Sequence, residues 1–224
     1  MSSLLERVQR LLERTYGMEA VVEDVGRFVV GDIGYERLYG RTDAVARVRS
    51  LGNRGAKTLI READGAVRLC IYYPDTLIRC LERHPPDRGV GEANIDAFAT
   101  LTEELDHLLC IAERAIQARP LSLFELELHA NVSKYLVLAR FLAGRSPRIE
   151  ARGRAWLLYH LFDKGVYCDE DPRARDRYRD AARWARRFLE RFGSLPPADR
   201  IGTLRRFHRA GASGKVRLIR ELAA

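Results

Sequence analysis

The chain lacks a long apolar run, since no stretch of its 224 residues approaches the roughly 18 apolar residues that a helix needs to span a bilayer. Residues 2–16 mix apolar side chains with Glu and Arg, which indicates an amphipathic helix and not a signal peptide. We therefore expect a cytoplasmic protein with no membrane partner. With 46% hydrophobic residues, the chain can bury an ordinary core, which argues against disorder.

Cysteine is scarce, and its spacing is not that of a metal-binding knuckle. The four cysteines, Cys70, Cys80, Cys110 and Cys168, form no C-x-x-C pair, and most sit among apolar neighbours. This arrangement indicates reduced, buried thiols and argues against a frame of disulfides or a zinc site built from cysteines.

Lysine is also scarce. Nearly all the basic residues are arginines, and the lysines are Lys57, Lys134, Lys164 and Lys215. The formal net charge of +8 would suit a polyanionic partner. An arginine bias of this kind also arises from a GC-rich coding sequence. The charge alone therefore does not identify a nucleic-acid partner.

The arginines are densest in residues 173–191, where aromatic side chains are interleaved with them. Tyr178, Trp184, Phe188 and Phe192 recur at helical spacing. This pattern favours an amphipathic helix packed on a core with its arginines outward. Binding of nucleic acid through phosphate contacts is the less favoured alternative.

The coarse pattern along the chain predicts an α+β fold. Residues 27–31 read as a short strand, and residues 57–61 and 66–72 flank a turn signal, Glu62-Ala-Asp-Gly65, as in a hairpin. We expect a small antiparallel or mixed sheet from these strands. Helical periodicity follows Pro74, with predicted helices at residues 75–83, 92–118, 121–143, 150–164, 171–192, 199–209 and 213–222.

We expect two parts in this chain. The first, residues 1–146, holds the sheet and the two long helices. The second, residues 147–224, is an Arg-rich helical extension packed on the first part.

The strongest functional clue is the helix predicted around residues 97–112. Glu103, Glu104 and His107 lie in an otherwise apolar stretch, where charge is costly unless it is paired or bound to a metal. Separations of three and four residues place all three at neighbouring positions on the helix surface. The spacing is that of H-E-x-x-H, with Glu in place of the first His. The alternative is a solvated edge with a hydrogen-bonded histidine.

A helical projection assigns the remaining faces of this segment. Glu104 lies between the apolar stripe and the face that carries Glu103 and His107, a suitable position for a general base beside a metal. The apolar stripe consists of Phe98, Leu101, Leu105, Leu108 and Ala112. A third face carries Thr102, Asp106 and Glu113, which we expect to be solvated.

The next helix carries a second polar set. Glu125 and His129 share one of its faces, and Glu127 and Asn131 lie on nearly the opposite one. Both faces cannot point at the same metal, and the spacing by itself does not decide between them.

Family resemblance adds to these patterns. Residues 98–109, F-A-T-L-T-E-E-L-D-H-L-L, resemble the helix F-x-x-A-H-E-L-G-H-x-L-L of the ImmA/IrrE-like metallopeptidases, gluzincin-type enzymes that cleave phage or stress-response repressors. Glu103 replaces the first His, and Asp106 replaces the Gly. The family's following helix, E-x-x-A-N-x-x-A-x-x-L-L, is similar to residues 127–138, with the same residues at Glu127, Ala130 and Asn131.

The resemblance covers roughly residues 1–143 and implies a zincin-like layout. It implies that His107 and Glu127 are metal ligands, that Glu104 is the base that activates water, and that strand 66–72 is an edge on which an extended peptide lies. Glu103 would be the third ligand. The implied partner is a peptide or protein.

Replacing an imidazole ligand by a carboxylate affects which metal ion the site prefers. Zinc accepts carboxylate oxygen, but two carboxylates shift the preference toward manganese or iron. A non-catalytic protein that keeps the scaffold for binding or regulation, with or without metal, is the alternative function.

Three further residues are candidates for supporting hydrogen bonds. Asn131 lies one turn from Glu127, and Tyr159 or His160 could bind an oxyanion. A helix-terminal histidine favoured by the helix dipole is the alternative for His160. A ferritin-like di-iron site would need a second Glu-x-x-His, which the sequence lacks.

Overall fold

The structure is a computed structural model. It describes residues 2–20, 22–39, 48–51, 55–63, 66–144, 146, 149–164 and 171–223. The chain forms two compact units, Met1–Arg10 with Ala20–Arg119 and Leu11–Glu19 with Pro120–Ala224. The helix α1, Leu4–Tyr16, contributes its first half to the first unit and its second half to the second. One small sheet followed by long helices confirms the predicted α+β class.

The sheet belongs to the first unit and has the strand order β1-β4-β3-β2. β3 and β4 form the predicted hairpin, with Lys57 opposite Tyr72 and Ala63 opposite Ala66. β2 is antiparallel to β3, and β1 is parallel to β4, so the sheet is mixed. The strands are β1 (Val29–Val30), β2 (Val48–Leu51), β3 (Lys57–Ala63) and β4 (Ala66–Tyr72).

The prediction that residues 66–72 form an edge strand was wrong. β4 lies between β3 and β1, and β1 pairs with its last two residues, Ile71 and Tyr72. β1 reaches this position because its two residues, Val29 and Val30, are β-branched and leave a short 3-10 turn, Val25–Phe28, directly beside β4. The end of β4 is therefore not available for a peptide strand.

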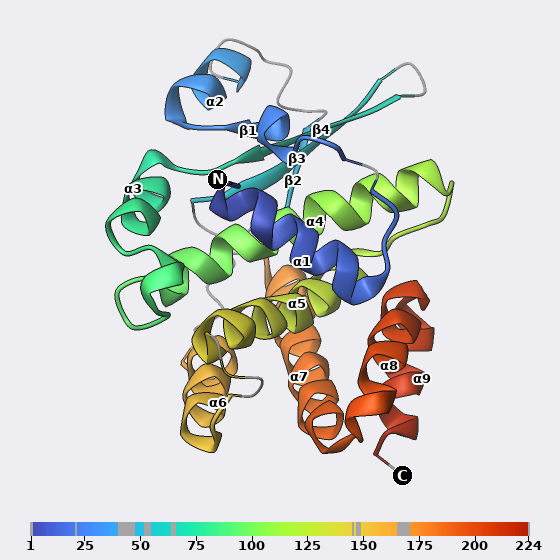
Figure 1. The fold of residues 1–224 in the computed structure, drawn as a ribbon. Helices are drawn as coiled ribbons and strands as arrows, with labels where there is room; N and C mark the ends of the chain where they lie inside the picture. Colours follow the sequence, from blue (N-terminus) through green and yellow to red (C-terminus); the bar gives the residue numbers. More distant parts are fainter. Residues whose placement is uncertain are drawn as a thin grey trace. The chain divides into compact units, whose positions relative to one another are not determined.

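Three α-helices complete the first unit. α4 runs along one face of the sheet and contacts both β3 and β4 (Figure 1). Asn94 precedes α4, and its side chain ties the entering loop together by donating to His84 O and Gly89 O, each at 2.9 Å. The helices are α2 (Asp32–Tyr39), α3 (Asp75–Arg83) and α4 (Ile95–Ile116).

α4 is buried around most of its circumference. The expectation that Thr102, Asp106 and Glu113 face solvent was wrong, since they are 0%, 1% and 6% exposed. Thr102 meets its hydrogen-bonding need inside the helix, because its hydroxyl donates to Phe98 O at 2.9 Å. A helix covered on several sides can carry polar residues at buried positions when the helix or its neighbours satisfy them.

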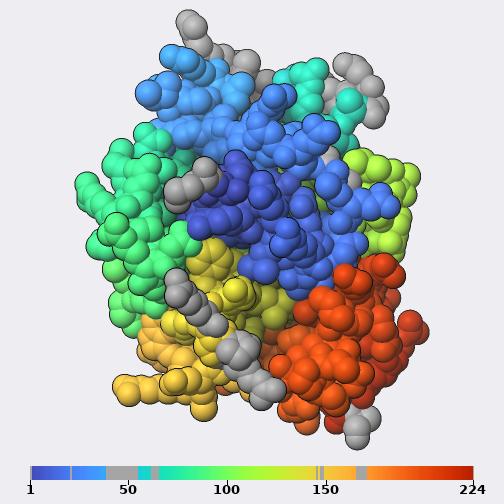
Figure 2. Space-filling view, in the orientation of Figure 1, coloured from blue at the N-terminus to red at the C-terminus, as the bar shows by residue number. Residues whose placement is uncertain are grey.

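The second unit consists of helices that pack around α5. α6, α7 and α9 all contact α5, and in Figure 1 they extend from the same side of it. On the face drawn in Figure 2, the side chains of α8 and α9 form a continuous surface. The elements are α5 (Leu123–Ala143), α6 (Ala151–Leu158), a π-turn (Tyr159–Asp163), α7 (Pro172–Ser194), α8 (Pro197–Arg209) and α9 (Ala212–Glu221).

This division differs from the boundary predicted at residue 146. The structure separates the units at Arg119, so α5 is grouped with the C-terminal helices. The physical reason is that α5 packs extensively along α7, and both helices carry fully buried apolar residues, such as Leu128 of α5 and Phe188 of α7.

The Arg-rich helix α7 has the predicted amphipathic pattern. Its buried stripe includes Ala181, Ala185 and Phe188, whereas Arg183 and Arg187 are exposed. Phe188 stacks on Phe207 of α8, with ring centroids 4.5 Å apart. α7 therefore contributes a core stripe to its unit and presents its arginines to solvent.

The described cysteines are free thiols, as expected, but only one of them is buried. Cys110 is 5% exposed, whereas Cys70 and Cys80 are only partly covered. Cys168 lies outside the described residues. None of the helices in the described part of the chain combines the length and apolar composition that a bilayer crossing requires.

Tyr72 at the end of β4 makes the first unit sensitive to alkaline pH. Its hydroxyl donates to Asp32 Oδ1 at 2.7 Å, and this hydrogen bond, followed by desolvation and the Asp32 charge, raises the pKa of Tyr72 to about 12. The folded protein thus favours the neutral phenol. Because the pKa of an unfolded tyrosine is about 10, this contribution to stability is present below pH 10 and disappears as the pH rises toward 12.

We expect the difference in unfolding free energy between the wild type and Tyr72→Phe to shrink as the pH is raised from 10 to 12. Urea unfolding at several pH values measures this difference. Phenolate absorbance should show one of the nine tyrosines titrating near pH 12 in the wild type. In Asp32→Asn, that titration should move to lower pH, because the charged acceptor is gone. A difference that stays constant with pH would contradict this role of Tyr72.

Candidate metal centre

α4 carries the residues of the E-E-x-x-H segment, as predicted. Glu103 is partly exposed, whereas Glu104 and His107 are 1% and 0% exposed. Glu103 and His107 lie one helical turn apart, so their side chains project from neighbouring positions. A charged and an imidazole side chain are thus held in the interior, where such groups require polar partners or a cation.

Glu104 is oriented by the sheet beneath α4. Thr58, a fully buried residue of β3, donates its hydroxyl to Glu104 Oε2 at 2.7 Å and also approaches Glu104 O at 3.2 Å. This hydrogen bond holds the Glu104 carboxylate in one orientation. Sequence reasoning missed Thr58, since a threonine in a strand is common and its partner lies 46 residues away.

Tyr73 lies near the same carboxylate. It is 1% exposed, and its hydroxyl donates to Leu101 O of α4 at 2.7 Å. Burial, together with the nearby charge of Glu104, raises the pKa of Tyr73 well above its ordinary value. Tyr73 therefore remains a neutral hydrogen-bond donor that fastens α4 to the end of β4.

α5 presents Glu127 and Asn131 on one face, as expected from their spacing. α5 starts at a regular cap, since the Ser122 side chain accepts from the Glu125 backbone N–H at 3.2 Å. Glu127 is 1% exposed, and the Asn131 side-chain amide donates to Glu127 O at 2.9 Å. Asn131 thus bonds to the backbone of the predicted ligand residue and adds to the rigidity of this turn.

The other face of α5 is engaged by the C-terminal helices of its own unit. Glu125 accepts from Lys215 Nζ at 3.4 Å, and His129 Nε2 lies 3.0 Å from His208 Nδ1. Both contacts are buried. Sequence spacing alone does not decide between the two faces of α5. The face of Glu125 and His129 already has polar partners in α8 and α9, which favours Glu127 as the ligand.

A chain of hydrogen bonds continues from His129. Ser133 Oγ lies 3.5 Å from His129 Nδ1 and 2.8 Å from the hydroxyl of Tyr16. The rings of Tyr16 and His129 are 4.4 Å apart. These residues build a polar network inside the second unit that no local sequence pattern indicates.

The predicted oxyanion candidates lie in the π-turn of the second unit. Tyr159 is 53% exposed, and the His160 ring packs 4.5 Å from Trp156 and 5.3 Å from Tyr159, centroid to centroid. A π-turn is frequent at functional sites, although it also occurs where a helix ends irregularly. The oxyanion role of Tyr159 or His160 stays a prediction.

The described residues include two groups of side chains that could hold a metal ion. One is Glu103, His107 and Glu127, the ligand set expected from the sequence. Its two carboxylates and one imidazole suit zinc as well as the harder ions manganese and iron. The donor chemistry of this group would therefore suit a divalent cation without selecting one metal.

The second group is Cys110, His129 and His208. The sequence does not predict this group, because the spacing of the cysteines argues against a zinc site built from them. A thiolate and two imidazoles suit zinc or copper. In the structure the two rings are already within hydrogen-bonding distance, so a metal would have to replace the proton that they share.

Comparisons of the chain with protein-family models, curated proteins and solved structures found no match.

Proposed function

We propose that the protein is a metal-dependent hydrolase that cleaves peptide bonds. Glu103, His107 and Glu127 are the metal ligands, and Glu104 is the general base. The observation that carries this proposal is the buried Glu104 carboxylate, which the Thr58 hydroxyl orients at 2.7 Å on the same helical turn as two of the candidate ligands. The resemblance of residues 98–109 and 127–138 to the two helices of the ImmA/IrrE-like peptidases supports the reaction type.

The ligands, Glu104 and Thr58 have separate roles that fit hydrolysis. A divalent ion held by the three ligands would supply Lewis acidity and lower the pKa of a bound water. Glu104 is not part of the ligand group, and its role is to accept the proton of the attacking water and return it to the leaving amine. Thr58 is a positioning residue that holds the carboxylate of Glu104 in one orientation.

Asn131 of α5 and Tyr73, which directly follows β4, support the arrangement through backbone contacts. The Asn131 amide bonds to the backbone of the ligand residue Glu127, and Tyr73 bonds to α4 two residues before Glu103. These bonds hold the backbone that carries the ligands in place before a metal or a substrate binds. The site is therefore built on rigid helices rather than on loops.

The first test is the metal content of the purified protein. We expect about one equivalent of divalent metal per chain in protein prepared without chelator, measured by elemental analysis. His107→Ala and Glu127→Ala should each reduce it to near zero, because each removes one of only three protein ligands. EDTA should lower the melting temperature of the wild type and leave these two variants unchanged, since metal stabilises only the state that binds it.

His84→Ala is the matched control, because it removes an exposed histidine of the same unit and should keep the metal. His208→Ala distinguishes the two candidate groups. Loss of metal in His208→Ala, with full metal in His107→Ala, would assign the ion to the second group and overturn the proposal.

A further inference from the structure

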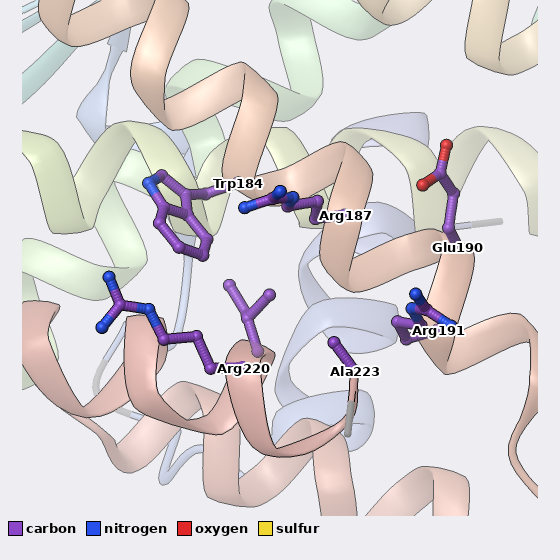
Figure 3. Close-up of a pocket in the computed structure, with 7 residues that line it drawn as sticks. Trp184, Arg187, Glu190, Arg191, Arg220 and Ala223 are labelled. Atoms are coloured by element: carbon purple, nitrogen blue, oxygen red, sulfur yellow. The ribbon is translucent and has the colours of Figure 1, made fainter.

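The second unit contains a cavity of about 430 Å³ between α7 and α9. Figure 3 shows Trp184 and Arg187 of α7 on one side of the opening, and Arg220 and Ala223 on the other. Its volume is within the range of sites for small molecules. The lining residues are Trp184, Arg187, Glu190, Arg191, Ile219, Arg220 and Ala223.

The cavity carries an excess of positive charge. Three arginines line it, and Glu190 is the one acidic residue of the lining. The Glu190 carboxylate points away from the opening in Figure 3 and accepts from Arg186 Nε at 3.2 Å. No carboxylate of the described residues lies within salt-bridge distance of Arg187, Arg191 or Arg220.

The other acidic residues of α7 and α9 are already paired with different arginines. Asp176 pairs with Arg179 at 3.1 Å, and Asp180 pairs with Arg183 at 3.0 Å. Glu221 of α9 faces Arg206 at 3.6 Å. Arg187 and Arg191 of α7 and Arg220 of α9, which have no carboxylate partner among the described residues, therefore lie together at the cavity.

Two of the three arginines lie against the indole ring of Trp184. The guanidinium carbons of Arg187 and Arg220 are 5.4 Å and 5.6 Å from the centroid of its ring. A guanidinium held against an aromatic ring keeps the N–H groups of its edge for bidentate bonds to phosphate. The indole is only half-buried, and an aromatic face beside arginines is the arrangement on which nucleobases stack.

We propose that this cavity binds a nucleotide, free or within a single strand. The phosphate is bound by Arg187, Arg191 and Arg220, and the base packs against Trp184. A simple anion would use the arginines but would leave the indole and Ile219 without a role. This site is separate from the proposed metal centre, and neither depends on the other.

Intrinsic fluorescence tests the proposal, because the chain has only two tryptophans. In a Trp156→Phe background, the emission of Trp184 reports on the cavity alone. The probes are thymidine monophosphate, an oligothymidylate of eight residues, and inorganic pyrophosphate. We expect a saturable change with the first two, and binding about tenfold weaker in Arg187→Ala and in Arg220→Ala.

Arg179→Ala is the matched control, since it removes the same charge from the same helix at a paired, exposed position. It should bind the nucleotides as tightly as the Trp156→Phe parent. Tighter binding of the oligonucleotide, with a log–log salt slope of about −0.7 for each phosphate contact, identifies a strand as the ligand. Equal binding of monophosphate and oligonucleotide identifies a free nucleotide.

Three results would overturn the proposal. The first is the absence of a saturable change with either nucleotide probe. The second is equal or tighter binding of pyrophosphate, which would mean a simple anion site with no base contact. The third is an equal loss of affinity in Arg179→Ala, which would mean general attraction to a positively charged helix.

Discussion

Glu104→Gln is expected to abolish peptide hydrolysis and to leave the metal content unchanged. The amide is as large as the carboxylate and still accepts from Thr58, but it cannot take a proton from water. Loss of a general base lowers kcat by about 10²- to 10⁴-fold. The assay is cleavage of fluorescein-labelled casein by protein loaded with its own metal, with elemental analysis of the same samples.

Two variants serve as references for this experiment. Glu82→Gln makes the same chemical change on the exposed side of α3 and should keep wild-type activity. Thr58→Val removes the hydrogen bond but keeps the base, so it should lower kcat by less than Glu104→Gln and change the pH dependence of the rate. That change would mark Thr58 as a positioning residue, because a purely structural role would leave the pH profile unchanged.

The possible outcomes separate the hydrolase from the alternatives. Loss of metal in Glu104→Gln would mean that Glu104 is a ligand and that the base was wrongly assigned. Metal without casein cleavage in the wild type would overturn the peptidase proposal and favour a scaffold that binds a partner without catalysis. The nucleotide proposal for the Trp184 cavity would be unaffected by either outcome.

Most of the helices could be predicted from the sequence, because their apolar period and their breaks are both local signals. α3 begins and ends at the predicted residues, and Asp171 caps α7 by accepting from Arg173 N at 3.0 Å. The hairpin of β3 and β4 was predicted from two strand-like segments that flank a turn signal. α2 and β2 were missed, because α2 contains Gly34 and has little amphipathic character, and β2 has only four residues.

The interior polar contacts could not be predicted from the sequence. Thr102, Asp106 and Glu113 share a helical face that reads as solvated, and only the elements around α4 bury it. The contact between Thr58 and Glu104 joins residues 46 positions apart, and that between His129 and His208 joins residues 79 apart. Spacing identified the candidate ligands, whereas their hydrogen-bonding partners depend on tertiary packing.

Lys215 is the clearest example of a buried polar residue whose contacts could not be predicted from the sequence. The Arg-rich composition suggests that basic side chains are on the surface, yet Lys215 of α9 is 1% exposed. Its ammonium group donates to His208 O at 3.2 Å and to Ala210 O at 2.5 Å, and lies 3.4 Å from Glu125 Oε1. One side chain thus caps the C-terminal end of α8 and joins α9 to α5.

Lys215→Met is expected to lower the free energy of unfolding by about 3–5 kcal/mol, because removing one partner leaves a buried carboxylate and two helix-terminal carbonyls without this donor. Both tryptophans lie in the second unit, so urea unfolding followed by tryptophan fluorescence reports on the affected helices. Lys164→Met, at an exposed position, should change the free energy by less than about 0.5 kcal/mol.

The double variant Lys215→Met/Glu125→Leu separates the cost of the orphaned charge from the cost of the lost cap. Replacing both members of a buried ion pair by apolar residues is often close to neutral, so the double variant should recover part of the stability that Lys215→Met loses. The remaining loss measures the two carbonyls of α8. A cost below about 1 kcal/mol for Lys215→Met would mean that water reaches Glu125 and the end of α8, in contradiction to the buried network around His208.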